Sequence, residues 1–357
     1  MGNPLNSTDR LPYVDVAKGV GILLVVLGHN AAFEPTTPIA KFIYSFHMPL
    51  FYFLAGLFHD DAKNFLPHVS SKAKSLLLPC ILAFATWLVI QAIIIPDILF
   101  PSLRDLWINA LYGTGKTLFW GQLWFLTSLF VTTCSCHLFI RSRILRNKNL
   151  RILVAIVLVP IGTWFLAWYP ARSPLYWISD RFFFTDLQGL PWNIDLLPIT
   201  AAFYLLGTTF PTQRFGNHGF KPHTYFFWSA LLFVAISVCP TDWGMDLNNR
   251  RYDHWAGSTF IAICGIGGAL LLSLAIVKLL RQWPSRTMSF IGKRSLFILV
   301  LHFSLQQNSF NKLLEKGVPW LAAVATSFAI GLGVPLAASM IWESTLRKMK
   351  GKQAPDR

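Results

Sequence analysis

The chain has 357 residues, of which 54% are hydrophobic and only 13% are charged. A soluble globular domain carries about 25% charged residues, so this composition excludes the ordinary soluble class. The formal net charge of +15 is typical of some nucleic-acid-binding proteins, but repeated apolar runs of about 20 residues predict an all-α, polytopic membrane helix bundle and no nucleic-acid partner.

Ten apolar runs are long enough to predict transmembrane helices, packed as one membrane domain over residues 1–357. They cover residues 13–33, 38–59, 75–95, 121–140, 152–170, 194–211, 222–240, 256–277, 288–308 and 319–342. If the N-terminus lies inside, most of the 31 Lys and Arg residues fall in inside segments, which predicts that both termini are cytoplasmic. The segment Ser102–Tyr112 is too short to cross and is expected to be interfacial or re-entrant.

The first run, Val14 to Phe33, carries three ionisable side chains, Asp15, Lys18 and His29. Lys18 and His29 are eleven residues apart, about three helical turns at ~3.6 residues per turn, so they are predicted to share one helix face with Asp15. Ionisable groups at membrane depth are costly and indicate a functional site. The alternative is that Asp15 and Lys18 pair near the interface while His29 ends the helix.

Three histidines fall at similar predicted depth: His29, His47 in SFHMPLF and His302 in LFILVLH. A single buried histidine is usually a hydrogen-bonded core residue, but three in one bundle favour a polar cavity. Histidine takes and returns a proton near neutral pH. Because no Ser or Cys stands in a nucleophile motif such as GxSxG, the pattern favours direct attack by an acceptor hydroxyl with histidine as general base.

The predicted external loops carry side chains that can bind hydroxyl groups. Asn249 and Arg250 lie in DWGMDLNNRRYDHW, and Asp195 begins the sixth predicted span, where it either lines the outer cavity or hydrates the helix end. We interpret Asn249 and Arg250 as acceptor-binding residues, with His302 at the same mouth. Trp177 and Trp192 in the larger loop fit a carbohydrate surface or the aromatic belt of the membrane interface equally well.

On the predicted inner side, basic residues form a collar that anionic lipid headgroups would largely explain. A negatively charged cytosolic donor such as coenzyme A would use the same side chains, and Ser295 would add backbone N–H groups at a helix start. The candidate donor-binding residues are Lys72, Lys74, Lys293, Arg294 and Ser295. The five cysteines have no zinc-site spacing, so no metal site is expected and they are predicted to be apolar packing residues.

Several blocks of the sequence together resemble the acyltransferase-3 family of integral membrane proteins. The first span, VDVAKGVGILLVVLGH, resembles the opening helix of that family, which has a basic residue, ten residues and then histidine. The family usually has arginine where this chain has Lys18, and the lysine version resembles its fucose 4-O-acetylase-like branch. Further agreement occurs, in order along the chain, in YSFHMPLFYFLAGLF, LWFLTSLF, NIDLLPITAAFYLLG, NNRRYDH and MSFIGKRSLFILVLH.

This resemblance implies an enzyme of the bacterial inner membrane that moves an acetyl group from cytosolic acetyl-CoA to a sugar hydroxyl. The acceptor would be a polysaccharide repeat unit or a lipid-linked oligosaccharide, and the partners would include the lipid bilayer and a polysaccharide assembly machinery. By position, the resemblance implies that His29 is the catalytic base and that Lys18 positions the donor. From the residues themselves we expect Asp15 to pair or act with Lys18, and His47 or a nearby polar group to donate the hydrogen bond that stabilises the oxyanion. Lysine cannot form the bidentate fork of arginine, which weakens any role in planar phosphate recognition.

Other readings use the same residues. Polar stripes and histidines in a wet cavity also suit a proton-coupled transporter or flippase, although no two-fold hydropathy repeat is apparent. A lipid- or protein-directed acyltransferase and a non-catalytic assembly partner are further alternatives.

Overall fold

The computed structural model describes residues 11–34, 37–94, 103–118, 120–168, 189–217, 219–240, 242–280 and 283–351. Within these ranges the chain is almost entirely helical, which confirms the predicted all-α class. The strands in these ranges are β1 (Met245–Asp246) and β2 (Arg251–Tyr252), which pair antiparallel with Met245 opposite Tyr252.

The helical elements range from single turns to long rods, and η marks a 3-10 or π turn. In chain order they are α1 (Pro12–Gly28), α2 (Pro38–Tyr44), α3 (His47–Leu57), α4 (Phe65–Lys72), η1 (Ala73–Leu77), α5 (Leu78–Ile94), α6 (Leu103–Tyr112), η2 (Gly121–Leu123), α7 (Trp124–Arg141), η3 (Arg143–Leu145), α8 (Lys148–Trp168), η4 (Pro191–Leu196), α10 (Leu197–Thr209), α11 (Thr212–Gly216), α12 (Pro222–Val238), α13 (Trp255–Leu279), α14 (Trp283–Lys293), α15 (Ser295–Glu315) and α16 (Trp320–Gly351).

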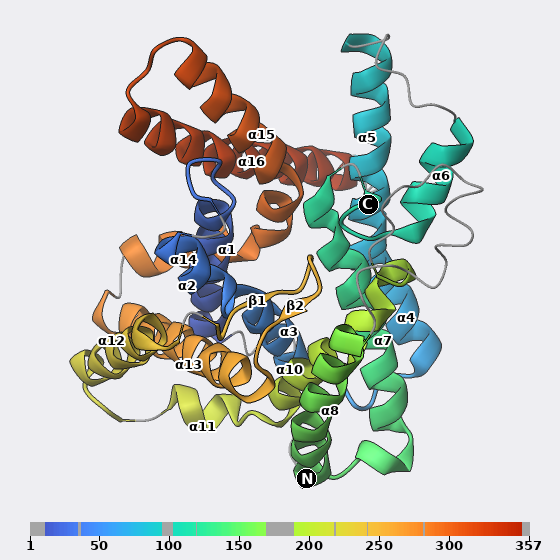
Figure 1. Cartoon of the computed structure of the whole chain (residues 1–357), viewed down its shortest axis with the longest axis vertical. Coiled ribbons are helices and arrows are strands. Elements are labelled where there is room, and N and C mark those ends of the chain that lie inside the picture. The colour runs from blue at the N-terminus through green and yellow to red at the C-terminus, as the bar shows by residue number, and fades with distance from the viewer. Residues whose placement is uncertain are drawn as a thin grey trace.

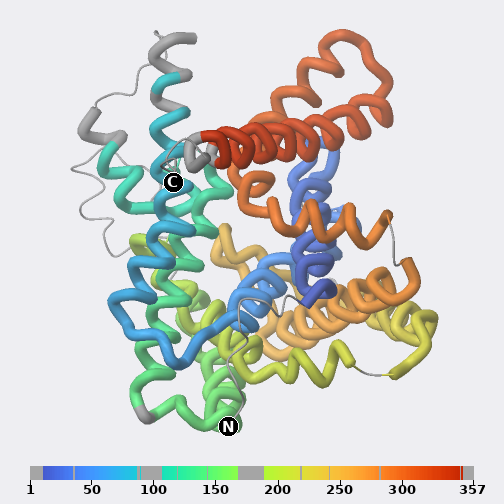
Figure 2. The backbone as a smooth tube through the Cα atoms, turned by 180° about the vertical axis from the view of Figure 1, so that it is seen from behind, coloured from blue at the N-terminus to red at the C-terminus, as the bar shows by residue number. Residues whose placement is uncertain are grey.

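Helix α1 lies among helices from both ends of the chain and packs against α3, α13, α14 and α15 (Figures 1 and 2). Pro12 starts the helix, because its fixed φ and missing N–H suit the first helical turn. Gly19 of α1 and Gly292 of α14 make the closest approach. A Cβ at Gly19 would collide with the Met288 carbonyl, and one at Gly292 with the Asp15 carbonyl. These glycines therefore let the two backbones touch.

The remaining helices pack in pairs around this centre: α10 against α3 and α8, α12 against α13, and α15 against α16 (Figure 1). The α3–α10 crossing uses a second glycine pair, since a Cβ on Gly56 would collide with the Tyr204 carbonyl and one on Gly207 with the Phe53 carbonyl. The apolar core runs through these contacts and includes buried Cys80, Cys136 and Cys264; all five cysteines are free thiols. The packing role predicted for those three is confirmed.

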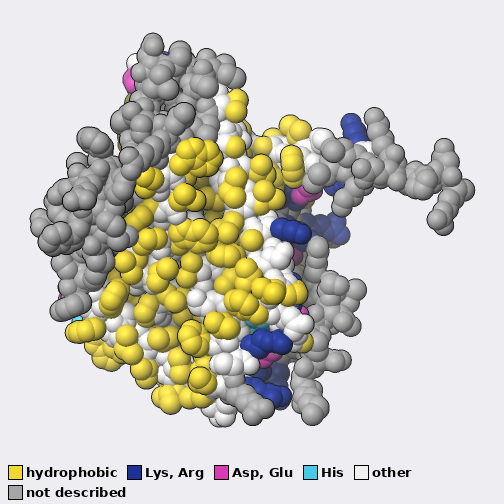
Figure 3. Space-filling model, turned by 90° about the vertical axis from the view of Figure 1, so that its right-hand side faces the viewer, with side chains coloured by type: hydrophobic (Ala, Val, Ile, Leu, Met, Phe, Trp, Pro, Cys, Tyr) yellow, Lys and Arg dark blue, Asp and Glu magenta, His cyan; other side chains and the backbone are white. Residues whose placement is uncertain are grey.

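Five helical stretches in the described part of the chain are long and apolar enough to cross a membrane. They are Phe65–Thr86, Gly121–Arg141, Lys148–Ala167, Trp255–Leu279 and Trp320–Thr345. Hydrophobic side chains dominate the face shown in Figure 3, and Lys and Arg side chains gather at one margin. The chain is therefore a multi-pass membrane protein, whereas the predicted number of ten spans and the side of each terminus remain predictions.

The predicted span 38–59 is not one continuous helix, because the chain breaks between α2 and α3. Phe46 leaves the helical conformation with φ −146° and ψ −13°. Pro49 explains the break: a continuous helix would force its ring against the carbonyl of Ser45, four residues earlier. The Ser45 hydroxyl instead donates a hydrogen bond to the Phe42 carbonyl oxygen at 2.7 Å and closes the end of α2.

Three other predicted spans also differ in detail. The segment 288–308 is not one helix, since α14 and α15 meet at a 77° bend at Arg294. Helix α1 ends at Gly28 rather than at residue 33. The sixth span starts irregularly, because Trp192 and Asn193 have left-handed φ angles of 57° and 60°. The segment near residue 102 forms the ten-residue helix α6, which is too short to cross a bilayer.

Candidate active site

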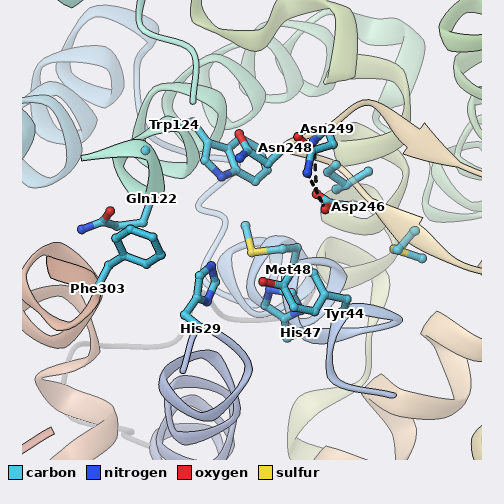
Figure 4. A pocket seen from close by; sticks show the side chains of 13 residues that line it. His29, Tyr44, His47, Met48, Gln122, Trp124, Asp246, Asn248, Asn249 and Phe303 are labelled. Atoms are coloured by element: carbon cyan, nitrogen blue, oxygen red, sulfur yellow. Dashed lines mark hydrogen bonds between the residues drawn. The ribbon is translucent and has the colours of Figure 1, made fainter. Parts of the chain in front are cut away.

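A cavity of about 210 Å³ lies where the end of α1, the α2–α3 break, the start of α7, the β1–β2 turn and α15 converge (Figure 4). Its polar lining includes His29, His47, Asp246 and the amides of Gln122 and Asn248. The other lining residues are Tyr44, Met48, Gly121, Trp124, Met245, Leu247, Asn249 and Phe303. Aromatic, apolar and hydrogen-bonding side chains therefore enclose a space of small-molecule size.

His29 is the C-cap of α1 and projects into this cavity (Figure 4). Its Nδ1 lies 3.0 Å from the Val25 carbonyl oxygen. Because a carbonyl can only accept, Nδ1 carries the proton and Nε2 keeps a free lone pair. The backbone is fixed as well, since Gln307 of α15 donates to the His29 carbonyl oxygen at 3.2 Å. The geometry thus holds a basic nitrogen toward the cavity.

The structure brings the three predicted histidines together. The His29 ring lies 6.3 Å from the ring of His47 and 5.4 Å from that of His302, centroid to centroid. His47 and His302 are buried, and each Nδ1 lies 2.9 Å from a carbonyl oxygen four residues earlier in the chain. All three imidazoles consequently carry hydrogen on Nδ1 and leave Nε2 as an acceptor.

Tyr44 joins this histidine group, with its ring 5.7 Å from His29 and 5.0 Å from His47. Gly28 explains how α2 approaches α1, because a Cβ there would lie 3.0 Å from the Ile43 side chain. The break after α2 then turns His47 back toward the same cavity. The free Nε2 atoms of the neutral histidines can only accept hydrogen bonds, whereas the Tyr44 hydroxyl can also donate one.

The opposite wall of the cavity is the turn between β1 and β2 (Figure 4). Asp246 accepts from Asn249 twice, from the backbone N–H at 3.1 Å and from Nδ2 at 2.7 Å. Asn248 reaches inward across Gly115, where a Cβ would collide with the Asn248 side chain. Asn249, predicted to bind the acceptor, therefore lines the cavity together with a carboxylate and a second amide.

Arg250 and Asp195 meet, but they do not line this cavity. Arg250 Nε lies 2.8 Å from Asp195 Oδ2, and both side chains are buried. Arg250 also donates to Asn193 Oδ1 at 2.8 Å, and its own φ of 56° is left-handed. Gly189, with φ 79°, faces the guanidinium, which would collide with any Cβ there. The pair anchors the β1–β2 turn, and its predicted part in acceptor binding stays a prediction.

The polar residues at the start of α1 face two different helices. Asp15 Oδ2 lies 3.8 Å from Lys293 Nζ of α14. Lys18 Nζ lies 4.4 Å from the Phe58 ring centroid, at the end of α3. His47, at the start of α3, contacts His29 at the end of α1, so the two helices run antiparallel. The two contacts are eleven residues apart on α1 and eleven residues apart on α3. Lys18 and His29 thus both contact α3, near its two ends, whereas Asp15, predicted on the same face, contacts α14 instead.

The predicted donor-binding residues lie in two parts of the molecule. Lys72 ends α4 and the exposed Lys74 lies in the π turn η1, whereas Lys293 and Arg294 lie at the α14–α15 bend and Ser295 begins α15. Arg294 is engaged by Glu343 of α16, with Nη2 2.6 Å from Oε2. Their common role in donor binding stays a prediction.

A second polar cluster lies away from the cavity, around His59, His68 and His137. The rings of His68 and His137 stack with centroids 4.0 Å apart, and His59 Nδ1 lies 2.8 Å from the Tyr204 hydroxyl. Asp61 contacts His59 Nε2 at 3.2 Å and Arg151 at 2.8 Å. The hydrogen bond from His59, together with Arg151, lowers the pKa of the Asp61 carboxyl below its ordinary value.

Several lining residues were not predicted as site residues. Tyr44 stands three residues before His47, which is one helical turn, and Trp124 opens the LWFLTSLF block, so both stood near recognised signals. Asp246 and Asn248 belong to the same loop as Asn249, which the sequence predicts as a hydroxyl-binding surface without singling out these two residues. Gln122 and Phe303 had no comparable signal beyond their proximity to Trp124 and His302. The described residues contain no group of three His, Cys, Asp or Glu side chains arranged to hold a metal ion. The loop residues around Trp177 lie outside the described ranges.

A family model described as an acyltransferase domain, Acyl_transf_3, matches residues 11–342. Nodulation protein NolL of Mesorhizobium japonicum is 25% identical over 356 residues, which cover 93% of this chain and 86% of that protein. No solved structure gives a significant match.

Proposed function

The chain belongs to the acyltransferase-3 family, and from this premise we propose that it is an integral membrane O-acetyltransferase of the bacterial inner membrane. It moves the acetyl group of cytosolic acetyl-CoA to a sugar hydroxyl on a polysaccharide repeat unit or a lipid-linked oligosaccharide. The observation that carries the proposal is His29 in the cavity lining, with the tautomer of its neutral ring set by the bond from Nδ1 to the Val25 carbonyl, which leaves Nε2 as the acceptor.

The proposed chemistry is direct transfer. His29 Nε2 accepts the proton of the acceptor hydroxyl while that oxygen attacks the thioester carbonyl. The tetrahedral oxyanion that forms needs a hydrogen-bond donor. His47 offers a lone pair at Nε2 in its neutral form, so the Tyr44 hydroxyl is the better donor. Collapse of the intermediate breaks the C–S bond, and the thiolate takes the proton from His29.

The acceptor is proposed to lie against the β1–β2 turn. Asp246, Asn248 and Asn249 offer carboxylate and amide groups that bind hydroxyls, and Trp124 offers an aromatic face on the neighbouring wall. Arg250 and Asp195 support this surface from behind through their buried ion pair. His302 supports His29 from α15. A hydroxylated ring is therefore a better match to the lining than an unfunctionalised acyl chain.

The donor is proposed to enter from the side of Lys18. Lys18 and His29 are separated by about 16 Å along α1 at ~1.5 Å per residue, a span that an extended donor with anionic and reactive ends can bridge. The predicted basic residues at the α14–α15 bend, Lys293 and Arg294 with Ser295, lie near this end of α1 through the Asp15–Lys293 contact. Lys72 of α4 and Lys74 of η1 would add positive charge.

The test combines a deletion strain with purified protein. Surface polysaccharide from the deletion strain is compared by NMR after complementation with wild type, His29→Gln or the control His223→Gln, which changes a histidine at the start of α12, away from the cavity. Wild type and the control are expected to restore one O-acetyl signal, and His29→Gln is not. Purified protein with acetyl-CoA and the acceptor separates transfer from transport, because a flippase would release no coenzyme A. Acceptor-dependent acetyl transfer by His29→Gln at the wild-type rate would overturn the proposed base.

A further inference from the structure

A groove of about 500 Å³ lies between the end of α14 and the last turns of α16, apart from the active-site cavity. Its lining consists of Phe290, Arg294, Met340, Glu343, Ser344 and Arg347. The lining thus combines two guanidinium groups, one carboxylate and one hydroxyl with two apolar side chains. This combination matches an amphiphile with an anionic head rather than a neutral ligand.

The two arginines of the groove differ in how tightly neighbouring side chains hold them and in their exposure. Arg294 is held, because its guanidinium stacks 3.8 Å from the Phe290 ring centroid and bonds Glu343 at 2.6 Å. Its Nε is buried and has no hydrogen-bond partner among the described residues. Arg347 is 80% exposed and lies 3.6 Å from the same carboxylate. One carboxylate faces two guanidinium groups, so the groove keeps one positive charge in excess.

The groove lies at the level of α16 where the exposed side chains change from apolar to basic. Val334, Met340, Ile341 and Trp342 are exposed apolar side chains on this helix, and the exposed Arg347 and Lys348 follow within two turns. Exposed apolar side chains of a membrane helix face lipid tails, while Trp, Lys and Arg mark the headgroup layer. The cationic groups of the groove are therefore at the depth of lipid phosphates.

We infer that this groove binds a phosphate ester, with an anionic phospholipid as the occupant that its position favours. The phosphate would lie between the guanidinium groups of Arg347 and Arg294, replacing part of the contact of Glu343, while the lipid tails lie along Met340 and the apolar face of α16. The phosphates of coenzyme A carry the same chemistry, and they are the other source that a test must separate.

An occupant of the groove would act on the active site through α15. Arg294 immediately precedes Ser295, the first residue of α15, which carries His302 against His29 and Gln307 against the His29 carbonyl. A phosphate that holds Arg294 would stabilise the 77° bend from which α15 starts. Binding at the groove goes beyond the proposed transfer reaction, since it does not require that His29 be a base.

The experiment measures binding, not acetylation. Purified full-length protein in neutral detergent is titrated with short-chain phosphatidylglycerol, with phosphatidylcholine of the same chain length, and with coenzyme A, by native mass spectrometry. Four proteins are compared: wild type, Arg347→Ala, Glu343→Gln and the matched control Lys348→Ala, which removes the same charge from the same helix outside the groove lining. Arg347 is exposed, so its substitution is not expected to disturb the fold.

Phosphatidylglycerol affinity is expected to fall about fivefold in Arg347→Ala, the effect of one interfacial basic side chain, and to stay near wild type in Lys348→Ala. Glu343→Gln should bind more tightly, because a competing carboxylate charge is gone. If coenzyme A alone shows the dependence on Arg347, the phosphate-ester site stands and the donor is its source. Equal losses in Arg347→Ala and Lys348→Ala, or no loss in either, would overturn the site. A failed acetylation assay leaves each of these results unchanged.

Discussion

The imidazole of His29 lies 5.4 Å from that of His302, centroid to centroid, with the two rings at 83° to each other. Each ring bonds a carbonyl of its own helix through Nδ1, but only His29 lines the cavity, whereas His302 is fully buried and its Nε2 has no hydrogen-bond partner among the described residues. The two histidines are chemically alike and differ in access. Access therefore assigns the proposed role of base to His29 and leaves His302 as its packing partner.

Substitution of His29 should separate chemistry from folding. His29→Gln is expected to lower the acetyl-transfer rate by about a hundredfold or more, the contribution of a positioned general base. The thermal midpoint in detergent should stay close to wild type, because His29 is only partly buried. The turnover number and the midpoint are measured together, with His223→Gln as the control. A variant that loses activity only in step with a lowered midpoint would contradict a role in chemistry.

The buried pair of Arg250 and Asp195 should govern stability more than substrate affinity. Arg250→Ala strands a buried carboxylate, which costs about 3–5 kcal/mol when one partner of such a pair is removed. Arg251→Ala is the adjacent control: its side chain is 51% exposed and its ion pair with Asp253 spans 3.4 Å, so a loss of at most about 1 kcal/mol is expected. Thermal unfolding in detergent measures both. An Arg250→Ala protein as stable as wild type but with a raised acceptor KM would favour direct contact with the acceptor.

The glycine contact between α3 and α10 should be intolerant of a methyl group. Gly207→Ala places a Cβ against the Phe53 carbonyl oxygen, so the two helices must separate, and an overpacked contact of this kind costs about 1–3 kcal/mol. The loss is measured as a lowered thermal midpoint in detergent.

The matched control for that substitution is Gly333→Ala on α16, where a Cβ would meet nothing within 4 Å. Alanine favours a helix over glycine by about 1 kcal/mol, so this variant should unfold at the same temperature as wild type or higher. Equal thermal midpoints for the two alanine variants would show that the α3–α10 contact is looser than the structure has it.

Acid should weaken the region around Asp61. The pKa of this carboxyl is lower in the folded protein than its ordinary value, through the hydrogen bond from His59 and the Arg151 charge. A lowered folded pKa stabilises the fold above the unfolded value of about 4, and this contribution is lost as pH falls through the folded pKa. Wild type should therefore lose stability below about pH 4 more steeply than Asp61→Asn, as followed by thermal midpoints against pH.

The control for this acid prediction is the neighbouring Asp60, whose carboxylate accepts a bond from the Ala62 N–H in the same loop. Asp60→Asn should keep the steep acid dependence of the wild type. A wild-type protein whose midpoint below about pH 4 fell no more steeply than that of Asp61→Asn would show that this ion pair contributes little.

Part of the site was accessible from residue spacing alone. Lys18 and His29 could be placed on one face because eleven residues make about three helical turns, and the depth of His47 and His302 pointed to a shared cavity. The roles of Asp15 and Arg250 were less accessible. Asp15 contacts Lys293, and Arg250 contacts Asp195 and Asn193, and these partners lie far away in sequence. Local spacing carries no information about such pairs, because it describes one helix at a time.

The breaks in the helices were hidden for a related reason. Hydropathy indicates which segments enter the membrane, and it is averaged over a whole stretch. The averages over 38–59 and 288–308 therefore do not register the breaks inside them. Pro49 gave a local reason for the first break, whereas the 77° bend at Arg294 follows from the contact of Gly292 with α1 and of Arg294 with Glu343. Only the packed molecule contains those contacts.

The sequence by itself determined that this is a helical membrane protein of the acyltransferase type, because apolar run length and the order of short motifs are properties of the chain alone. The tertiary structure decided that His29 and His47 line the cavity while His302 does not, that Tyr44 and Asp246 complete the lining, and that Arg250 pairs with Asp195. Access, burial and long-range pairing depend on how helices cross, and the crossings are set by glycine contacts and bends between segments that are distant in the chain.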